Sequence, residues 1–261
     1  MIRYFVQLEY KGTNYSGFQK QKNTRNTVQA KLNKALSAVA NHRVLTVCAG
    51  RTDSGVHATN QIVHFDTNSK RTLKSWINGT NRYLPDDISI KGVYKVENKL
   101  HARFDATSRT YKYLIRRSEQ KIGLLSDSCL WIRKELNINL MNKACIHLLG
   151  EKDFTSFRAS GCQAESAVRS IYEAYLKQKG PFIIFHIRAN AFLLNMIRII
   201  VGTLIQVGTK EISVPQFKRI IQSKKRSLAG KTVEPKGLYF YGPEYNTFQY
   251  EINECFIDEL D

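Results

Sequence analysis

The order of helical and strand-like patterns is similar in the two halves of this chain, and it constrains the fold more than any other feature. In the first half, an alternating segment at 4–10 precedes a helical pattern at 27–36, and strand patterns follow on both sides of Asp53. A helical pattern at 73–83 and a strand pattern at 88–96 complete the order β-α-β-β-α-β.

The second half contains a similar series. Its strand patterns lie at 106–116, 170–177, 182–188 and 238–241, and its helical patterns at 140–149, from 192 onward, and at 214–225. No long Gly-, Ser- or Pro-rich linker separates the halves. We therefore expect an α+β fold of two ferredoxin-like β-α-β-β-α-β halves, docked into an extended antiparallel sheet with a central cleft. The expected domains are residues 1–105 and 106–261.

The segment 49–58, with the sequence AGRTDSGVHA, places one carboxylate on a turn. Arg51 lies two residues before Asp53, Gly55 lies two residues after it, and apolar strand-like residues flank the segment. A nearby guanidinium favours an ionised carboxylate that can act as a nucleophile or base. The alternative is an ordinary turn in which Asp and Gly serve the backbone alone, and the spacing by itself favours that alternative. An aspartic protease needs two paired carboxylates. Because the Asp-Ser-Gly tripeptide occurs only once in this chain, the motif does not indicate an aspartic protease.

The charge of the chain predicts a polyanionic partner. Its 261 residues include 40 Lys and Arg against 22 Asp and Glu, which gives a net charge of +18, and nucleic acid is the leading candidate for such a protein. The polar loop that contains Lys20, Lys22 and Arg25 is expected to contact phosphates, with a solvated loop as the alternative. For the basic cluster at 218–226, the helical spacing favours a solvated face.

No motif indicates a metal or a nucleotide cofactor. The five cysteines are widely spread without a CxxC pair, and the histidines show no metal-ligand spacing. The Gly-Lys-Thr at 230–232 resembles the end of a phosphate-binding loop, but Lys225 stands where the first glycine would be.

The sequence predicts neither a signal peptide nor a membrane span. The N-terminus has the pattern of a strand and not of a signal peptide. Polar residues interrupt the apolar stretch at 192–207, which predicts a core helix and not a membrane span.

Two further residues, Tyr111 and Arg198, can each be interpreted in two ways. Tyr111 alternates with Arg109 and Tyr113 along a strand, where it could stack on an unpaired base or belong to the core. Arg198 lies in the apolar helical pattern with Asn195 three residues before it, and a guanidinium in such surroundings needs a carboxylate partner. Asp53 is one candidate, and an external salt bridge is the default.

Taken together, these motifs resemble the tRNA pseudouridine synthase A family. The matching segments occur in family order across roughly residues 4–242: YSGFQ at 15–19, GRTDSGVHA at 50–58, HARFDA at 101–106, RTYKY at 109–113, DFTSFR at 153–158, ANAFL at 189–193, MIR at 196–198, IVG at 200–202 and GL at 237–238. Two departures are visible. Ser54 stands where the family usually has Ala, and Phe18 stands where Trp is frequent.

The resemblance implies an isomerase that converts uridine to pseudouridine at positions 38, 39 and 40 of the tRNA anticodon stem-loop, without a cofactor. It implies that Asp53 is the catalytic aspartate, through either a covalent adduct or a glycal intermediate. Arg51 would help to flip the target nucleotide. Tyr111 would stack on the flipped base, and Arg198 would pair with Asp53.

The resemblance also implies how the protein meets its substrate. Lys20, Lys22 and Arg25 would bind the tRNA backbone, and a homodimer in the cytoplasm would share the tRNA between its subunits. Two other functions remain open at this point. One is a non-catalytic RNA-binding protein on the same fold, and the other is a hydrolase that uses Asp53 against a small substrate.

Overall fold

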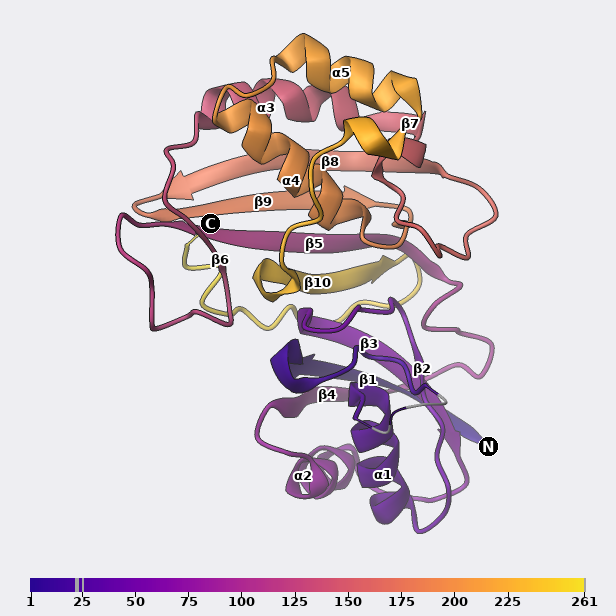
Figure 1. The fold of residues 1–261 in the computed structure, drawn as a ribbon. Helices are drawn as coiled ribbons and strands as arrows, with labels where there is room; N and C mark the ends of the chain where they lie inside the picture. Colours follow the sequence, from indigo (N-terminus) through magenta and orange to yellow (C-terminus); the bar gives the residue numbers. More distant parts are fainter. Residues whose placement is uncertain (22–23, 25, 261) are drawn as a thin grey trace. The chain divides into compact units, whose positions relative to one another are not determined.

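The computed structural model describes residues 1–21, 24 and 26–260. Among these residues it contains five α-helices and ten strands, and the strands belong to a mixed, mostly antiparallel sheet. This confirms the predicted α+β fold with an extended sheet. The chain divides into two compact units, the first formed by residues 1–109 and 239–255, and the second by residues 110–238 and 256–261 (Figure 1).

The sheet of the first unit is built around the N-terminal strand. Strand β1 (Ile2–Tyr10) pairs antiparallel with β3 (His57–Thr67) on one side and with β4 (Ile88–Val96) on the other. The short β2 (Val47–Cys48) also pairs with β3. Strand β10 (Leu238–Tyr245) runs parallel to β3 and returns the chain to this unit. The expected division into an N-terminal domain of residues 1–105 and a C-terminal domain of residues 106–261 stays a prediction.

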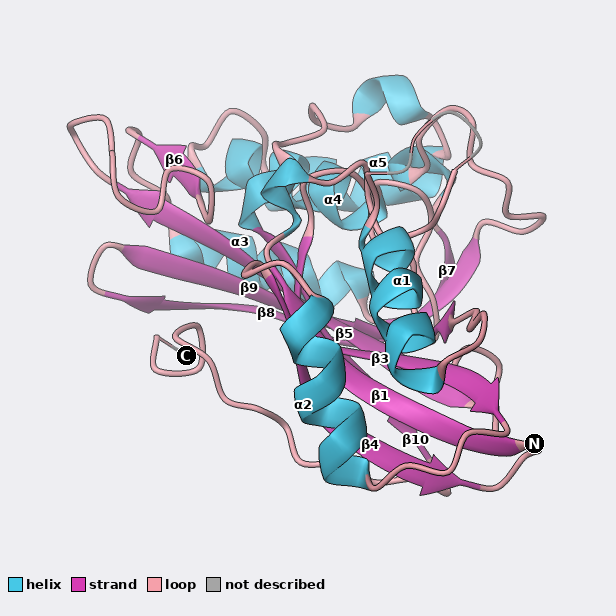
Figure 2. Cartoon of the chain, turned by 90° about the horizontal axis from the view of Figure 1, so that it is seen from below, coloured by secondary structure: helices cyan, strands magenta, loops and turns pink. Residues whose placement is uncertain are grey.

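Two amphipathic helices cover one face of this sheet (Figures 1 and 2). Helices α1 (Val28–Ala40) and α2 (Leu73–Tyr83) pack against each other, and each begins at a threonine whose side chain caps the first turn. The Trp76 ring of α2 lies 5.1 Å from the Phe65 ring and 5.8 Å from the Tyr4 ring, measured between centroids. These aromatic contacts fix α2 to the sheet.

The second unit contains the remaining strands. Strand β5 (Ala106–Arg117) begins at its boundary, and β8 (Val168–Lys179) pairs antiparallel with β9 (Phe182–Ala189). Two short strands were not expected from the sequence. They are β6 (Leu130–Ile132), parallel to β5, and β7 (Gly150–Asp153), antiparallel to β8, and both are too short to show an alternating pattern.

Three helices pack together in the second unit: α3 (Ile138–Cys145), α4 (Met196–Gly208) and α5 (Val214–Ser223). The expectation that the apolar helix starts at Phe192 was wrong. Asn195 adopts a left-handed conformation with φ of 58°, which ends the preceding loop and lets α4 begin at Met196. Among the described residues, no helix has both the length and the apolar character that a membrane span requires.

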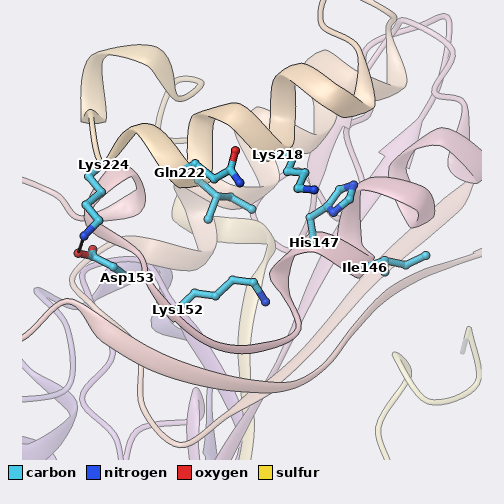
Figure 3. Close-up of a pocket in the computed structure, with 8 residues that line it drawn as sticks. Ile146, His147, Lys152, Asp153, Lys218, Gln222 and Lys224 are labelled. Carbon is cyan, nitrogen blue, oxygen red and sulfur yellow. Dashed lines mark ion pairs between the residues drawn. The ribbon is translucent and has the colours of Figure 1, made fainter.

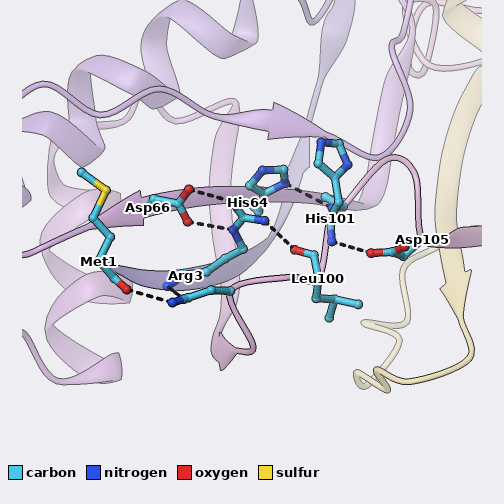
Figure 4. A network of polar contacts seen from close by, with 9 residues as sticks. Met1, Arg3, His64, Asp66, Leu100, His101 and Asp105 are labelled. Atoms are coloured by element: carbon cyan, nitrogen blue, oxygen red, sulfur yellow. Dashed lines mark hydrogen bonds and ion pairs between the residues drawn. The ribbon is translucent and has the colours of Figure 1, made fainter.

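A polar network around the buried His64 joins β1 and β3 to the loop before β5 (Figure 4). The His64 Nδ1 atom accepts a hydrogen bond of 3.1 Å from the Ala102 N–H, so this nitrogen carries no proton. Arg3 donates two bonds of 2.7 Å to the Asp66 carboxylate, and the His101 ring lies 4.5 Å from the His64 ring. Burial first, and then the charges of Arg3 and His101, lower the pKa of His64 to about 4, although Asp66 opposes them.

This network predicts a loss of stability in mild acid. Below pH 6.5 the unfolded chain takes up a proton at His64 that the folded protein excludes, so the free energy of unfolding falls as the pH drops towards 4, by up to about 3 kcal/mol. Urea unfolding of His64→Gln should show a smaller change in free energy between pH 6.5 and 5. His147→Gln, at a half-buried position in the second unit, should follow the wild type. Equal pH slopes in all three proteins would refute the assignment.

Candidate active site

Asp53 lies on a tight turn between β2 and β3. The Val56 N–H donates to the Asp53 carbonyl oxygen at 3.2 Å, and Gly55 has the positive φ of 78° that such a turn favours for glycine. Asp53 is half-buried and Arg51 is exposed. The turn is therefore where the sequence predicts it, with a carboxylate and a guanidinium two residues apart on one loop.

A second segment holds this turn from one side. The Phe18 N–H donates to the Thr52 carbonyl oxygen at 3.0 Å, and the Ser54 hydroxyl donates to the Tyr15 carbonyl oxygen at 3.0 Å. The buried Tyr10 hydroxyl and the Thr52 hydroxyl lie 2.7 Å apart. Two motifs that are 35 residues apart in the sequence thus form one backbone assembly, and Asp53 lies between two of its anchor points, Thr52 and Ser54.

Two glycines make this approach possible. Gly17 has a φ of 87°, and a Cβ atom there would lie 2.8 Å from the Thr52 carbonyl oxygen. A Cβ atom at Gly12 would lie 1.9 Å from the Val56 carbonyl oxygen, which no side chain can occupy. The Gly12 N–H also donates to the His57 Nδ1 atom at 3.0 Å. Only backbone without side chains can come this close to the turn.

Side chains of Arg109 and Gln61 hold the strand end that precedes the turn. The Arg109 guanidinium donates to the Ala49 carbonyl oxygen from Nε at 3.4 Å and from Nη2 at 3.3 Å, and it also donates to the carbonyl oxygens of Arg103 and Ala106. The Gln61 amide donates to the Gly50 carbonyl oxygen at 2.6 Å. From the sequence alone Arg109 is predicted only as a strand residue beside Tyr111, because no local spacing reveals a partner 60 positions away.

The region around the turn is electropositive. Burial raises the pKa of the Cys48 thiol to about 12, while the positive charges of Arg51, Arg103 and Arg109 act in the opposite direction. The positive charges of three guanidinium groups, from two different segments, therefore lower the pKa of one buried thiol close to the turn. An anionic substrate would be attracted to this surface.

Tyr111 and Arg198 belong to the second unit. Tyr111 is buried in β5, and its ring makes an edge-to-face contact with Phe192 at a centroid distance of 5.2 Å. The half-buried Arg198 donates to the Val233 carbonyl oxygen at 2.7 Å and to the Asn195 side-chain oxygen at 2.8 Å. The structure thus brings Asp53 and Arg51 together on one loop of the first unit and places Tyr111 and Arg198 in the second unit.

Only part of the predicted basic loop lies in the described chain. Lys20 is exposed, and its backbone N–H donates to the Gln29 side-chain oxygen at 2.9 Å, so the loop starts at a fixed point. Lys22 and Arg25 lie outside the described residues.

A basic hollow of about 360 Å³ lies in the second unit (Figure 3). Helix α5 contributes Lys218 and Gln222 to it, and Lys152 comes from β7. The Lys224 ammonium pairs with the Asp153 carboxylate at 3.0 Å. Part of the predicted basic cluster at 218–226 therefore lines a hollow, and Lys152 is a further cation there that no local sequence pattern reveals.

Within the described part of the chain, no group of three or more His, Cys, Asp or Glu side chains could hold a metal ion.

Comparison with known proteins identifies the family. The family model described as tRNA pseudouridine synthase matches residues 7–105 and 144–246. The chain belongs to the tRNA pseudouridine synthase family. It is 44% identical over 250 residues to tRNA pseudouridine synthase A of Francisella philomiragia, covering 96% of each chain. It is 45% identical over 251 residues to the protein of the same name from Francisella tularensis strain SCHU S4, covering 96% of this chain and 97% of the relative.

Family membership confirms the enzyme class that the sequence motifs implied. A pseudouridine synthase is an isomerase, and this family acts on uridine in tRNA. The family match includes the turn with Asp53 and the segment around Tyr15 that holds it. The positively charged surface around this turn suits an RNA substrate.

The geometry at Gly17 predicts that this position accepts no side chain. Gly161 has a similar φ of 81°, but no atom lies within 4 Å of a Cβ added there, so it is the matched control. Gly161→Ala should cost about 1–2 kcal/mol of unfolding free energy, from the left-handed backbone alone. Gly17→Ala should cost about 1–3 kcal/mol more, because the Thr52 carbonyl must move. Urea unfolding measures both values, and equal losses would contradict the close approach.

Proposed function

We propose that this chain isomerises uridine to pseudouridine at positions 38, 39 and 40 of the tRNA anticodon stem-loop, with Asp53 as the catalytic carboxylate. The observation that carries the proposal is the anchoring of the Asp53 turn by residues 12–18 beside the exposed Arg51. A carboxylate that must act on one sugar carbon needs such a rigid support. Family membership supplies the reaction type.

The reaction rearranges two bonds at the target nucleotide. The N1–C1′ bond breaks, the uracil turns, and a C5–C1′ bond forms, while the hydrogen of C5 leaves as a proton and N1 gains one. Asp53 either attacks C1′ to form a covalent adduct or removes the C2′ proton to form a glycal. Both routes need an ionised carboxylate. No oxidant or reductant enters this balance, so the proposal includes no cofactor.

In the proposal, Arg51 helps to flip the target nucleotide out of the RNA helix. A uridine inside a stem is stacked and paired, so the enzyme must flip it out of the helix to reach C1′. The exposed Arg51 side chain, two residues before Asp53, would fill the space that the base leaves or contact the adjacent phosphate. Its charge would also stabilise the ionised form of Asp53.

Tyr111 and Arg198 would complete the active site. In the proposal the Tyr111 ring stacks on the flipped uracil, and the Arg198 guanidinium pairs with the Asp53 carboxylate. The fixed bonds from Arg198 to Val233 and Asn195 support a role in orientation, since a positioned guanidinium can hold a carboxylate in one geometry. The cleft that this arrangement requires is part of the proposal.

The tRNA itself would be bound largely through its backbone. Lys20, Lys22 and Arg25 would contact phosphates, and the net charge of +18 supports attraction over a wide surface. We further propose that the enzyme acts as a homodimer in the cytoplasm, with both subunits contacting the tRNA.

Tritium release tests the role of Asp53. The new C5–C1′ bond displaces the hydrogen of C5, so tRNA labelled there releases tritium only if the isomerisation proceeds. Asp53→Asn removes the negative charge at constant volume, and it should abolish release while tRNA affinity changes by less than a few-fold. Asp86→Asn, at an exposed loop position of the same unit, should release tritium like the wild type. Loss of tRNA binding in Asp53→Asn, with no selective loss of turnover, would count against the proposal.

The same experiment separates the other functions. A non-catalytic RNA-binding protein would bind tRNA tightly and release no tritium from it. A hydrolase would release free uracil, which thin-layer chromatography of the products detects.

Salt dependence tests the phosphate contacts. The logarithm of the tRNA association constant should fall steeply with the logarithm of salt concentration, and Lys20→Ala should reduce the magnitude of this slope by about 1, as expected for one lost phosphate contact. Lys99→Ala is the control, because that lysine is paired with Glu97 at 2.9 Å. Filter binding between 50 and 300 mM KCl, on the order of the range in which such contacts weaken, gives both slopes. An unchanged slope in Lys20→Ala would remove this residue from the tRNA interface.

A further inference from the structure

Phe104 is a large aromatic residue that the structure leaves exposed. It lies in the HARFDA segment at 101–106, directly before β5, and 74% of its surface is accessible. The proposed function gives this segment no role. Exposing a phenylalanine ring costs free energy that burial would recover.

The Phe104 ring has two neighbours within its own loop, an imidazole and a guanidinium. The imidazole of His101 stacks on it at a centroid distance of 4.3 Å and an interplanar angle of 23°. The Arg103 guanidinium carbon lies 5.5 Å from the ring centroid. These contacts fix the orientation of the ring while most of its surface stays accessible.

The backbone of this segment is also fixed. The His101 Nδ1 atom accepts hydrogen bonds from the N–H groups of Arg103 and Phe104, both at 3.1 Å. The Asp105 carboxylate accepts a hydrogen bond of 2.7 Å from the backbone N–H of His101. The Tyr245 hydroxyl donates to the Ala102 carbonyl oxygen at 2.6 Å. Phe104 is therefore carried on a preorganised loop, which lowers the entropic cost of binding.

This loop is tied to the segment that leads into the Asp53 turn. One atom, Nη2 of Arg109, donates both to the Arg103 carbonyl oxygen and to the Ala49 carbonyl oxygen. The backbone next to Phe104 and the backbone that leads to Arg51 thus share one guanidinium. The charges of Arg51 and Arg103 both act on the Cys48 thiol, which agrees with this proximity.

We propose that the Phe104 ring is a stacking surface for an unpaired nucleobase of the RNA substrate, next to the nucleotide that is isomerised. The proposal rests on the proposed function, since it needs an RNA bound at the Asp53 turn. An aromatic face can stack on any base, and the surrounding guanidinium groups attract the phosphates on either side of it. The positive surroundings favour RNA over a second apolar protein surface as the occupant.

The test compares tRNA affinity in variants that change the ring and keep the fold. Phe104→Ala should raise the Kd for an unmodified tRNA transcript about tenfold, within the range for one lost base–aromatic stack. Phe104→Leu keeps the apolar bulk without the ring and should lose nearly as much, whereas Phe104→Trp should restore wild-type affinity. Tyr83→Ala removes another exposed aromatic residue of the first unit and should leave the Kd unchanged.

Two further measurements distinguish stacking from other roles. Phe104→Ala should leave the salt slope of binding unchanged, because no phosphate contact is lost, while Arg103→Ala should reduce it. KM should rise by a larger factor than kcat falls. A Kd for Phe104→Ala within twofold of the wild type, full affinity in Phe104→Leu, or no rescue by Phe104→Trp would each overturn the proposal.

Failure of this proposal differs from failure of the proposed function. If the Phe104 ring has no role, the wild type still releases tritium from labelled tRNA and the Phe104 variants bind like it. If the proposed function fails, the wild type releases no tritium, and the Kd values of the variants still report whether the ring contacts RNA.

Discussion

The close contact between the backbone of residues 12–18 and the turn at 52–56 is the constraint on which the rest of the site depends. Gly12 and Gly17 permit it because neither position has room for a Cβ atom. The bonds from Phe18 to Thr52 and between Ser54 and Tyr15 then fix the residues on both sides of Asp53. The strands β1 and β3 carry the two segments, so the core of the first unit determines where the carboxylate lies.

Arg109 provides the complementary support. Its guanidinium satisfies the backbone oxygens of two loops and places Arg51 and Arg103 near the same buried thiol. The site therefore combines a carboxylate on a tightly anchored turn with a concentrated positive charge. The first is what sugar chemistry at one carbon requires, and the second is what an RNA backbone requires. The chain belongs to the tRNA pseudouridine synthase family, which acts on uridine in tRNA.

Much of the fold follows from local pattern, and the rest depends on long-range contacts. Helix α2 and strand β4 have the predicted bounds, because their hydrophobic periods are long and regular. Helix α4 begins four residues later than expected because Asn195 takes a left-handed conformation that periodicity does not reveal. The Asp53 turn was predictable from Gly and Asp in sequence, whereas the tether through Arg109 and the exposure of Phe104 depend on tertiary packing. The roles of Asp53, Arg51, Tyr111 and Arg198 stay predictions.

The most direct test of the account is a crystal structure of this protein with an anticodon stem-loop that carries 5-fluorouridine at the target position. The fluorine at C5 prevents the final proton loss, so the complex should be trapped on the enzyme. If Asp53 is the catalytic carboxylate, the nucleotide should be flipped, with its C1′ or C2′ atom bonded to an Asp53 carboxylate oxygen or within about 3.5 Å of it. A flipped sugar that faces a different side chain, with Asp53 directed only at the protein backbone, would refute a catalytic role for Asp53.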